Sequence, residues 1–104
     1  PVLKISEVFM EQVKEFKERP DGSQYTNFKK VYNTRECLIN KEYIVSIYPH
    51  EFTSSIDVAK VDGVFPAGTK FSTFVVDGSS FRSSEIVVLG SFDKFCRLLQ
   101  ENQP

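Results

Sequence analysis

The most regular hydrophobic pattern runs from Lys70 to Leu99 and begins with a predicted hairpin. In the run KFSTFVV, which ends at Val76, apolar side chains fall on both faces of an alternating strand. This is typical of a central strand that is covered on both sides. Asp77 and Gly78 follow, and such a pair tolerates the positive φ of a tight hairpin turn. We therefore expect a hairpin at this turn, with residues 81–86 returning as the second strand.

The pattern after this hairpin predicts a C-terminal helix. Gly90 ends the strand, and Ser91 supplies a hydroxyl that can cap a helix N-terminus. The apolar residues that follow have the spacing i, i+3, i+4 and i+7 of one helical face: Phe92, Phe95, Cys96 and Leu99. Cys96 is then a core residue of this stripe and needs no chemical role.

The segment Ser6–Arg19 allows two interpretations. Four apolar residues recur at intervals of four, four and three: Ile5, Phe9, Val13 and Phe16. This spacing forms one face of a helix, whereas strand alternation fails because Val13 and Phe16 differ in parity. We predict a helix. The alternative is a strand that enters a hairpin through Arg19–Gly22, whose sequence Arg-Pro-Asp-Gly favours a turn.

The middle of the chain predicts a second pair of strands. The run TRECLI and the run YIVSIY are short and rich in β-branched or aromatic residues. Asn40–Glu42 lies between them, and asparagine favours turns. Pro49 ends the second run. We expect these runs to pair as an antiparallel hairpin.

A weakly patterned connection, Thr53–Thr69, follows this pair. Its first half predicts a short strand or a bend, and its second half is rich in glycine and proline. Val64 and Phe65 are apolar residues within the second half. They either tuck into the core, which we favour, or form an exposed contact for a partner.

Together these elements predict an α+β fold. We expect a small antiparallel sheet of four to six strands with an N-terminal and a C-terminal helix. If Ser6–Arg19 is a strand, the alternative is a mainly β, barrel-like domain. The 104 residues suit one domain, residues 1–104, with one core. The chain has 10 Phe and 4 Tyr, which is more aromatic side chain than such a core must hold.

Charge limits the functions that can be expected. The 13 basic and 14 acidic residues give a net charge of -1, and strong non-specific binding to nucleic acid normally needs a basic surface. A local exception is the acid-free segment Gly22–Arg35. Its cations and rings form a candidate contact for nucleic acid or another anion: Lys29, Lys30, Arg35, Tyr25, Phe28 and Tyr32. The simpler interpretation is a solvated strand or loop.

Residues that could support catalysis or bind metal are few. His50 is the only histidine, and it could act as a general base oriented by Glu51, although an exposed loop histidine is the simpler interpretation. One histidine and two separated cysteines, Cys37 and Cys96, do not match a zinc site. No phosphate-binding loop is present. We therefore expect neither a catalytic site nor a metal or cofactor.

The N-terminal residues and the absence of a long apolar run predict a cytoplasmic protein. No apolar run approaches the roughly 20 residues of a membrane-spanning helix. Charges interrupt VLKISEVFMEQVKEF throughout, unlike a signal peptide. Both cysteines are expected to be buried thiols in a reducing compartment.

Four short runs lie in order along the later two-thirds of the chain: CLIN, YIVSI, FVVDGSSF and SFDKFCRLL, at residues 37–40, 43–47, 74–81 and 91–99. In these runs the chain resembles small bacterial and phage proteins of the FlbD type. The C-terminal part of LytTR-type DNA-binding domains is similar in a looser sense. This chain differs by the insertion of residues 49–69 and by some 30 added residues at the front. The resemblance implies a small regulatory or adaptor protein and supplies no catalytic residue.

We therefore expect a small non-enzymatic binding, regulatory or adaptor protein that acts through protein contacts. Because the chain carries more rings than its core must hold, we expect some of them to cover an interface between copies. A nucleic-acid-binding module using residues 22–35 is the alternative. A small enzyme using His50 is the third hypothesis.

Overall fold

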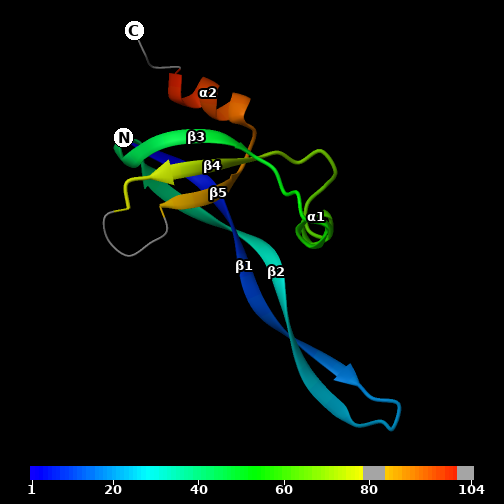
Figure 1. Ribbon diagram of the computed structural model, residues 1–104. Coiled ribbons are helices and arrows are strands. Elements are labelled where there is room, and N and C mark those ends of the chain that lie inside the picture. Colours follow the sequence, from blue (N-terminus) through cyan, green and yellow to red (C-terminus); the bar gives the residue numbers. More distant parts are fainter. Residues whose placement is uncertain (79–83, 101–104) are drawn as a thin grey trace.

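The strands form one open antiparallel sheet (Figure 1). The computed structural model describes residues 1–78 and 84–100. The strands are β1 (Val2–Glu18), β2 (Gln24–Asn40), β3 (Ile44–His50), β4 (Phe71–Val76) and β5 (Glu85–Leu89). The helices are α1 (Ser55–Asp62), α2 (Phe92–Gln100) and a short 3-10 helix, η1 (Lys41–Tyr43). The spatial order is β2-β1-β5-β4-β3, with β2 and β3 at the edges.

The predicted N-terminal helix is wrong, and with it the α+β class with a helix at each end. Ser6–Arg19 belongs almost entirely to β1. Ile5, Phe9 and Val13 are four residues apart, a spacing that keeps side chains on one face of a strand as well as near one face of a helix. Phe16 falls on the opposite face and is 78% exposed. A strand was rejected on the assumption that every apolar residue in this segment is buried, and Phe16 is not.

The alternative for this segment, a strand that enters a hairpin, is correct. β1 and β2 pair residue for residue, from Val2 opposite Asn40 to Glu18 opposite Gln24. In the turn between them, the Asp21 carboxylate accepts hydrogen bonds from the backbone nitrogen of Ser23 at 2.9 Å and from its hydroxyl at 2.6 Å. These bonds lower the pKa of Asp21 below its ordinary value. The barrel that was expected to accompany this strand is not formed, because the sheet stays open.

The predicted hairpin between TRECLI and YIVSIY is also wrong. Both runs are strands, but β2 pairs with β1 and β3 pairs with β4. The η1 turn therefore joins the two edge strands of the sheet. Its three residues bring these edges close together where β2 ends and β3 begins. Asn40 caps η1, with its side-chain oxygen accepting a hydrogen bond from the backbone nitrogen of Glu42 at 3.0 Å. It does not serve a tight hairpin turn.

The connection Thr53–Thr69 contains a helix where a short strand or bend was predicted. α1 begins after Ser54, whose hydroxyl accepts a hydrogen bond from the backbone nitrogen of Asp57 at 3.1 Å. Serine followed three residues later by an acid is the signature of a helix N-terminus, so the signal was present in the sequence. Within the described part of the chain, neither α-helix is long and apolar enough to cross a membrane.

The pairing of β4 with β5 confirms the predicted second hairpin, but its turn is longer than expected. Val75 lies opposite Glu85, and the backbone nitrogen of Val76 donates to the carbonyl of Ser84 at 2.7 Å. With a tight turn at Asp77 and Gly78, the return strand would have begun directly after Gly78. The predicted return at residues 81–83 lies outside the described residues.

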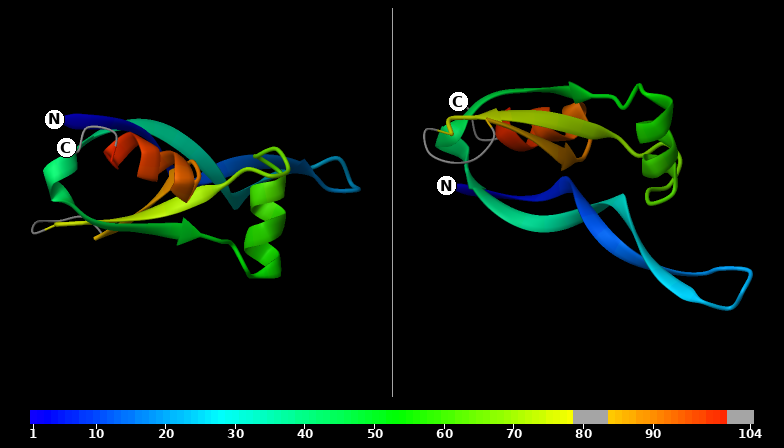
Figure 2. Two further views of the ribbon diagram at one scale, coloured as in Figure 1. Left: turned by 90° about the horizontal axis from the view of Figure 1, so that it is seen from above. Right: turned by 60° about the horizontal axis from the view of Figure 1, so that its bottom comes forward.

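Buried residues form one cluster on each face of this sheet, as strand alternation requires. Leu3, Ile5, Phe74 and Val88 pack with Phe95 of α2 on one face. Val8 and Phe71 pack with Val61 of α1 on the other face. The two rings of β4, Phe71 and Phe74, therefore pack into clusters on opposite faces, which confirms β4 as an internal strand covered on both sides. Figure 2 shows that α1 and α2 are separated from each other and lie against different parts of the sheet.

The predicted C-terminal helix is confirmed. The hydroxyl of Ser91 accepts a hydrogen bond from the backbone nitrogen of Lys94 at 3.1 Å. Phe95 is only 2% exposed, and its ring meets that of Phe74 edge to face with 4.9 Å between centroids. Leu99 packs against the same cluster. The amphipathic stripe thus covers the sheet as its spacing predicted.

Replacing Gly90 with alanine is expected to lower the free energy of unfolding by about 1–3 kcal/mol. Gly90 has φ +136, and an added Cβ would lie 2.9 Å from the Phe95 ring. Urea denaturation measures the loss. Gly63→Ala is the matched control, because Gly63 has φ -73 and its nearest neighbours would be 3.6 Å away. Equal stability of the two variants would contradict this role of Gly90.

Candidate functional site

The distal part of the first hairpin projects from the body of the protein as a two-stranded ribbon (Figures 1 and 2). We call residues 11–31 the arm. Among the described residues, β1 pairs with β5 only at Glu7 and Val8. From Val8, β1 continues for ten residues to Glu18, about 33 Å, and over this length β2 is the only described strand that pairs with it. The longest dimension of the molecule is 69 Å. Every residue from Phe16 to Lys30 is exposed.

One face of the arm combines rings with cations. Phe16 is 78% exposed and Phe28 is 52% exposed. Lys14 lies directly opposite Phe28, and Lys30 lies opposite Gln12, so all belong to the same face. We call Lys14, Phe16, Phe28 and Lys30 the ring face. Glu18, at the tip, shares this face. The opposite face carries Glu11, Val13 and Glu15, which are half-buried.

The six residues proposed for an anion or nucleic-acid contact are divided between these faces. The cause is the alternation of side chains along β2, which sends odd-numbered and even-numbered residues to opposite sides. Phe28, Lys30 and Tyr32 lie on the side of the ring face, and Tyr25, Lys29 and Arg35 lie on the other. No single surface therefore presents all six.

Arg35 has a partner within the fold. Its Nε donates a hydrogen bond to a carboxylate oxygen of Glu7 at 3.0 Å, and its guanidinium lies 4.4 Å from the centroid of the Phe9 ring. Glu7 is only 8% exposed. This hydrogen bond and the charge of Glu7 raise the pKa of Arg35. Arg35 therefore balances a buried carboxylate at the base of the arm.

Tyr32 joins the base of the arm to α1. Its ring meets that of Phe52 edge to face with 5.3 Å between centroids, and its hydroxyl donates to Asp57 at 3.4 Å. Burial and the charge of Asp57 raise the pKa of Tyr32. Lys60 adds a second tie, because its Nζ donates to the carbonyl of Lys30 at 2.8 Å. These contacts fix the direction in which the arm leaves the body.

Tyr25 lies near the tip, where its ring lies under the guanidinium of Arg19 at 4.5 Å. Lys29 and the side chain of Lys30 are exposed. Of the six candidates, Phe28 and Lys30 thus remain on an open surface together. Sequence reasoning missed Phe16 and Lys14, which complete that surface. The available signal was an apolar residue out of strand parity within the charged run KEFKER.

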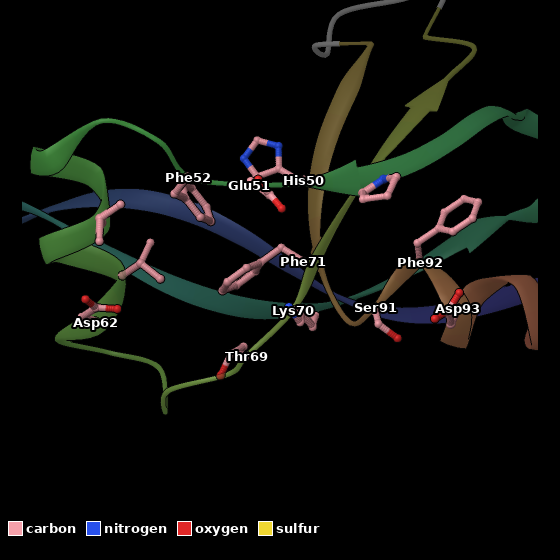
Figure 3. A pocket seen from close by; sticks show the side chains of 13 residues that line it. His50, Glu51, Phe52, Asp62, Thr69, Lys70, Phe71, Ser91, Phe92 and Asp93 are labelled. Atoms are coloured by element: carbon pink, nitrogen blue, oxygen red, sulfur yellow. The ribbon is translucent and has the colours of Figure 1, made fainter.

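A groove of about 490 Å³ lies at the end of the sheet, between α1 and the start of α2 (Figure 3). It is lined by the end of β3 and the residues just after it, by α1, by the residues that lead into β4 and by those at the start of α2. The apolar part of the lining includes Phe52, Val58, Val61, Phe71 and Phe92. The charged part has three acids and one lysine: Glu51, Asp62, Asp93 and Lys70. The groove is therefore an apolar hollow with an acidic rim.

His50 belongs to this groove and is held by neutral groups. Its Nδ1 lies 2.9 Å from the hydroxyl of Thr73, and its ring meets that of Phe52 with 4.7 Å between centroids. Thr73 is only 2% exposed, so its hydroxyl is not open to a substrate. Glu51, the proposed orienting carboxylate, is exposed. Among the described residues, no group of three or more side chains could hold a metal ion.

The loop pair Val64 and Phe65 is divided between core and surface. The ring of Phe65 meets that of Phe71 with 5.2 Å between centroids and packs on the α1 cluster. Val64 is 48% exposed. Phe65 thus tucks inward, and Val64 alone is available to a partner.

Comparisons with protein-family models, curated proteins and solved structures give no match to this chain. The resemblance to FlbD-type and LytTR-type proteins therefore stays a prediction.

Proposed function

We propose that this protein is a non-enzymatic binding protein that acts through protein contacts and self-associates through its arm. The observation that supports this most directly is the exposure of Phe16 and Phe28 on one side of a largely polar ribbon. A two-stranded hairpin without a covered apolar face is marginally stable in water. Contact with another protein surface would cover these rings and stabilise the arm.

The composition of the ring face suits a protein interface. Aromatic side chains are enriched at the centres of interfaces, where they supply much of the binding energy. Met10, at the base of the arm and on the same side, is 38% exposed and extends the apolar surface toward the body. The free edge of β2 could also add main-chain hydrogen bonds to a partner.

A variant with both arm rings changed, Phe16→Ser and Phe28→Ser, is expected to remain folded and to lose self-association. Both side chains are exposed, so the serines remove interface area without opening the core. Sedimentation velocity over a range of concentrations measures the assembly. Leu38→Ser is the matched control. Leu38 lies on β2, as Phe28 does, and is 67% exposed, but it is outside the arm. A wild-type chain that stays monomeric, or a double variant that assembles equally well, would contradict the proposal.

The proposed setting is the cytoplasm. Cys37 and Cys96 are free and half-buried thiols, as expected in a reducing compartment. A regulatory or adaptor role, which the FlbD-type resemblance implies, is compatible with a protein whose notable surface is a contact arm.

Nucleic-acid binding is the second candidate function, because Lys14 and Lys30 flank Phe28 on the ring face. Cations can hold phosphates while a ring stacks on a base. Glu11, Glu15 and Glu18 on the same arm oppose a polyanion. Steep loss of DNA or RNA binding between low and moderate salt would favour this candidate, and no binding at low salt would remove it.

A further inference from the structure

We propose that the arm of one copy docks into the groove of another copy, with Phe16 or Phe28 inserted among the apolar groove residues. This inference depends on the self-association proposed above and names the surface that receives the arm. The occupant is another copy of this chain, because the arm and the groove are complementary in polarity and charge.

The apolar complementarity comes from rings that lack cover and a hollow that can receive them. Phe16 projects from a narrow ribbon and is 78% exposed. The groove measures about 490 Å³ and is lined in part by Phe52, Val58 and Phe71. This volume lies within the roughly 300–1,000 Å³ typical of sites that bury a ligand. An aromatic side chain carried on a ribbon can enter such a groove edge-on and meet its rings.

The charge complementarity comes from the rim of the groove and the flanks of the arm rings. The rim carries Glu51, Asp62 and Asp93 against one lysine, Lys70, with His50 beside them. The ring face carries Lys14 and Lys30 against one acid at the tip, Glu18. Opposite charges on facing surfaces speed encounter and fix orientation.

These charged groups are available for contacts between copies. Within residues 1–78 and 84–100, the ion pairs join Lys4 to Glu36, Lys17 to Glu15, and Arg35 to Glu7. None of the three rim acids and neither lysine of the ring face belongs to these pairs. Pairing between copies would therefore break no ion pair seen in the single chain.

An arm cannot reach the groove of its own chain. The arm projects about 33 Å beyond Val8, and the ties of Tyr32 to Asp57 and of Lys60 to Lys30 hold its base against α1. To fold back, the ribbon would have to break these ties and its own strand pairing. The contact is therefore intermolecular. Because it joins two different surfaces, it is heterologous, and each copy offers both an arm and a groove to its neighbours.

A mixing experiment tests this arrangement with two variants that are defective on opposite surfaces. The arm variant is Phe16→Ser with Phe28→Ser, which keeps the groove. The groove variant is Glu51→Lys with Asp62→Lys, both at exposed positions, which keeps the arm. Each variant alone is expected to associate at least about tenfold more weakly than the wild type, because central interface rings and paired charges dominate affinity. Mixed in equal amounts, they should form a complex of one copy of each, since one intact arm then meets one intact groove.

The controls separate this inference from the proposed function. Glu36→Lys with Glu42→Lys changes the net charge as much as the groove variant does, at exposed positions away from the groove, and should assemble like the wild type. Circular dichroism confirms that each variant is folded. A groove variant that assembles normally, or a mixture that stays monomeric, would overturn docking in the groove while leaving arm-mediated association intact. A monomeric wild type would overturn the proposed function itself.

Discussion

Replacing Phe74 with alanine is expected to lower the free energy of unfolding by about 3–5 kcal/mol. Phe74 is fully buried at 0% exposure, at the centre of the cluster under α2. Its ring meets Phe95 edge to face, so its removal opens a cavity and loses this contact between the sheet and α2. Native domains are stable by only about 5–15 kcal/mol. The variant should therefore lose a large part of its stability, measured as a lower urea midpoint.

The matched control for this prediction is Phe16→Ala. It removes the same atoms from a strand residue that is 78% exposed, and exposed substitutions usually change stability by about 0.5 kcal/mol or less. A loss below about 1 kcal/mol for Phe74→Ala would show that the cluster under α2 is not a main source of stability.

Removing the arm is expected to leave a folded monomer. Met10 and Tyr32 are cross-strand partners, so an Asn-Gly turn can replace residues 11–31 and close the hairpin between them. No residue of the arm is fully buried, and both core clusters remain. The free energy of unfolding should therefore change by only about 1 kcal/mol, because an exposed ribbon adds little stability. Thermal melting and sedimentation measure stability and assembly on the same sample.

Two results would contradict this prediction. If the shortened chain does not fold, the arm contributes to the core and is not a separate contact element. If it folds and still associates like the wild type, the interface lies on the body of the protein, for example at the free edge of β3.

Strand β4, its pairing with β5 and helix α2 could be predicted from the sequence, because their signals are local, whereas α1 was missed. The spacing of the α2 stripe and the cap at Ser91 define that helix, and rings of opposite parity identify β4 as a covered strand. The first half could not be predicted in the same way. Phe16 obscured the strand pattern because it is exposed on the arm, and β2 has its partner in β1 rather than in the next strand along the chain.

The candidate site was less predictable than the fold. A basic and aromatic segment was visible in residues 22–35, but strand alternation divides its members between two faces. The groove could not be predicted from the sequence. Its acids Glu51, Asp62 and Asp93 lie on separate segments of the chain and are brought to one groove only where β3, α1 and α2 converge. Such a surface depends on tertiary packing that no local pattern encodes.

The most direct measurement is the solution mass of the wild-type chain by light scattering across a range of concentrations. A single chain has a mass of 11.9 kDa. If the arm joins copies of this protein, the measured mass will rise with concentration to that of a dimer or larger assembly. A mass that stays at 11.9 kDa at every concentration would contradict self-association through the arm.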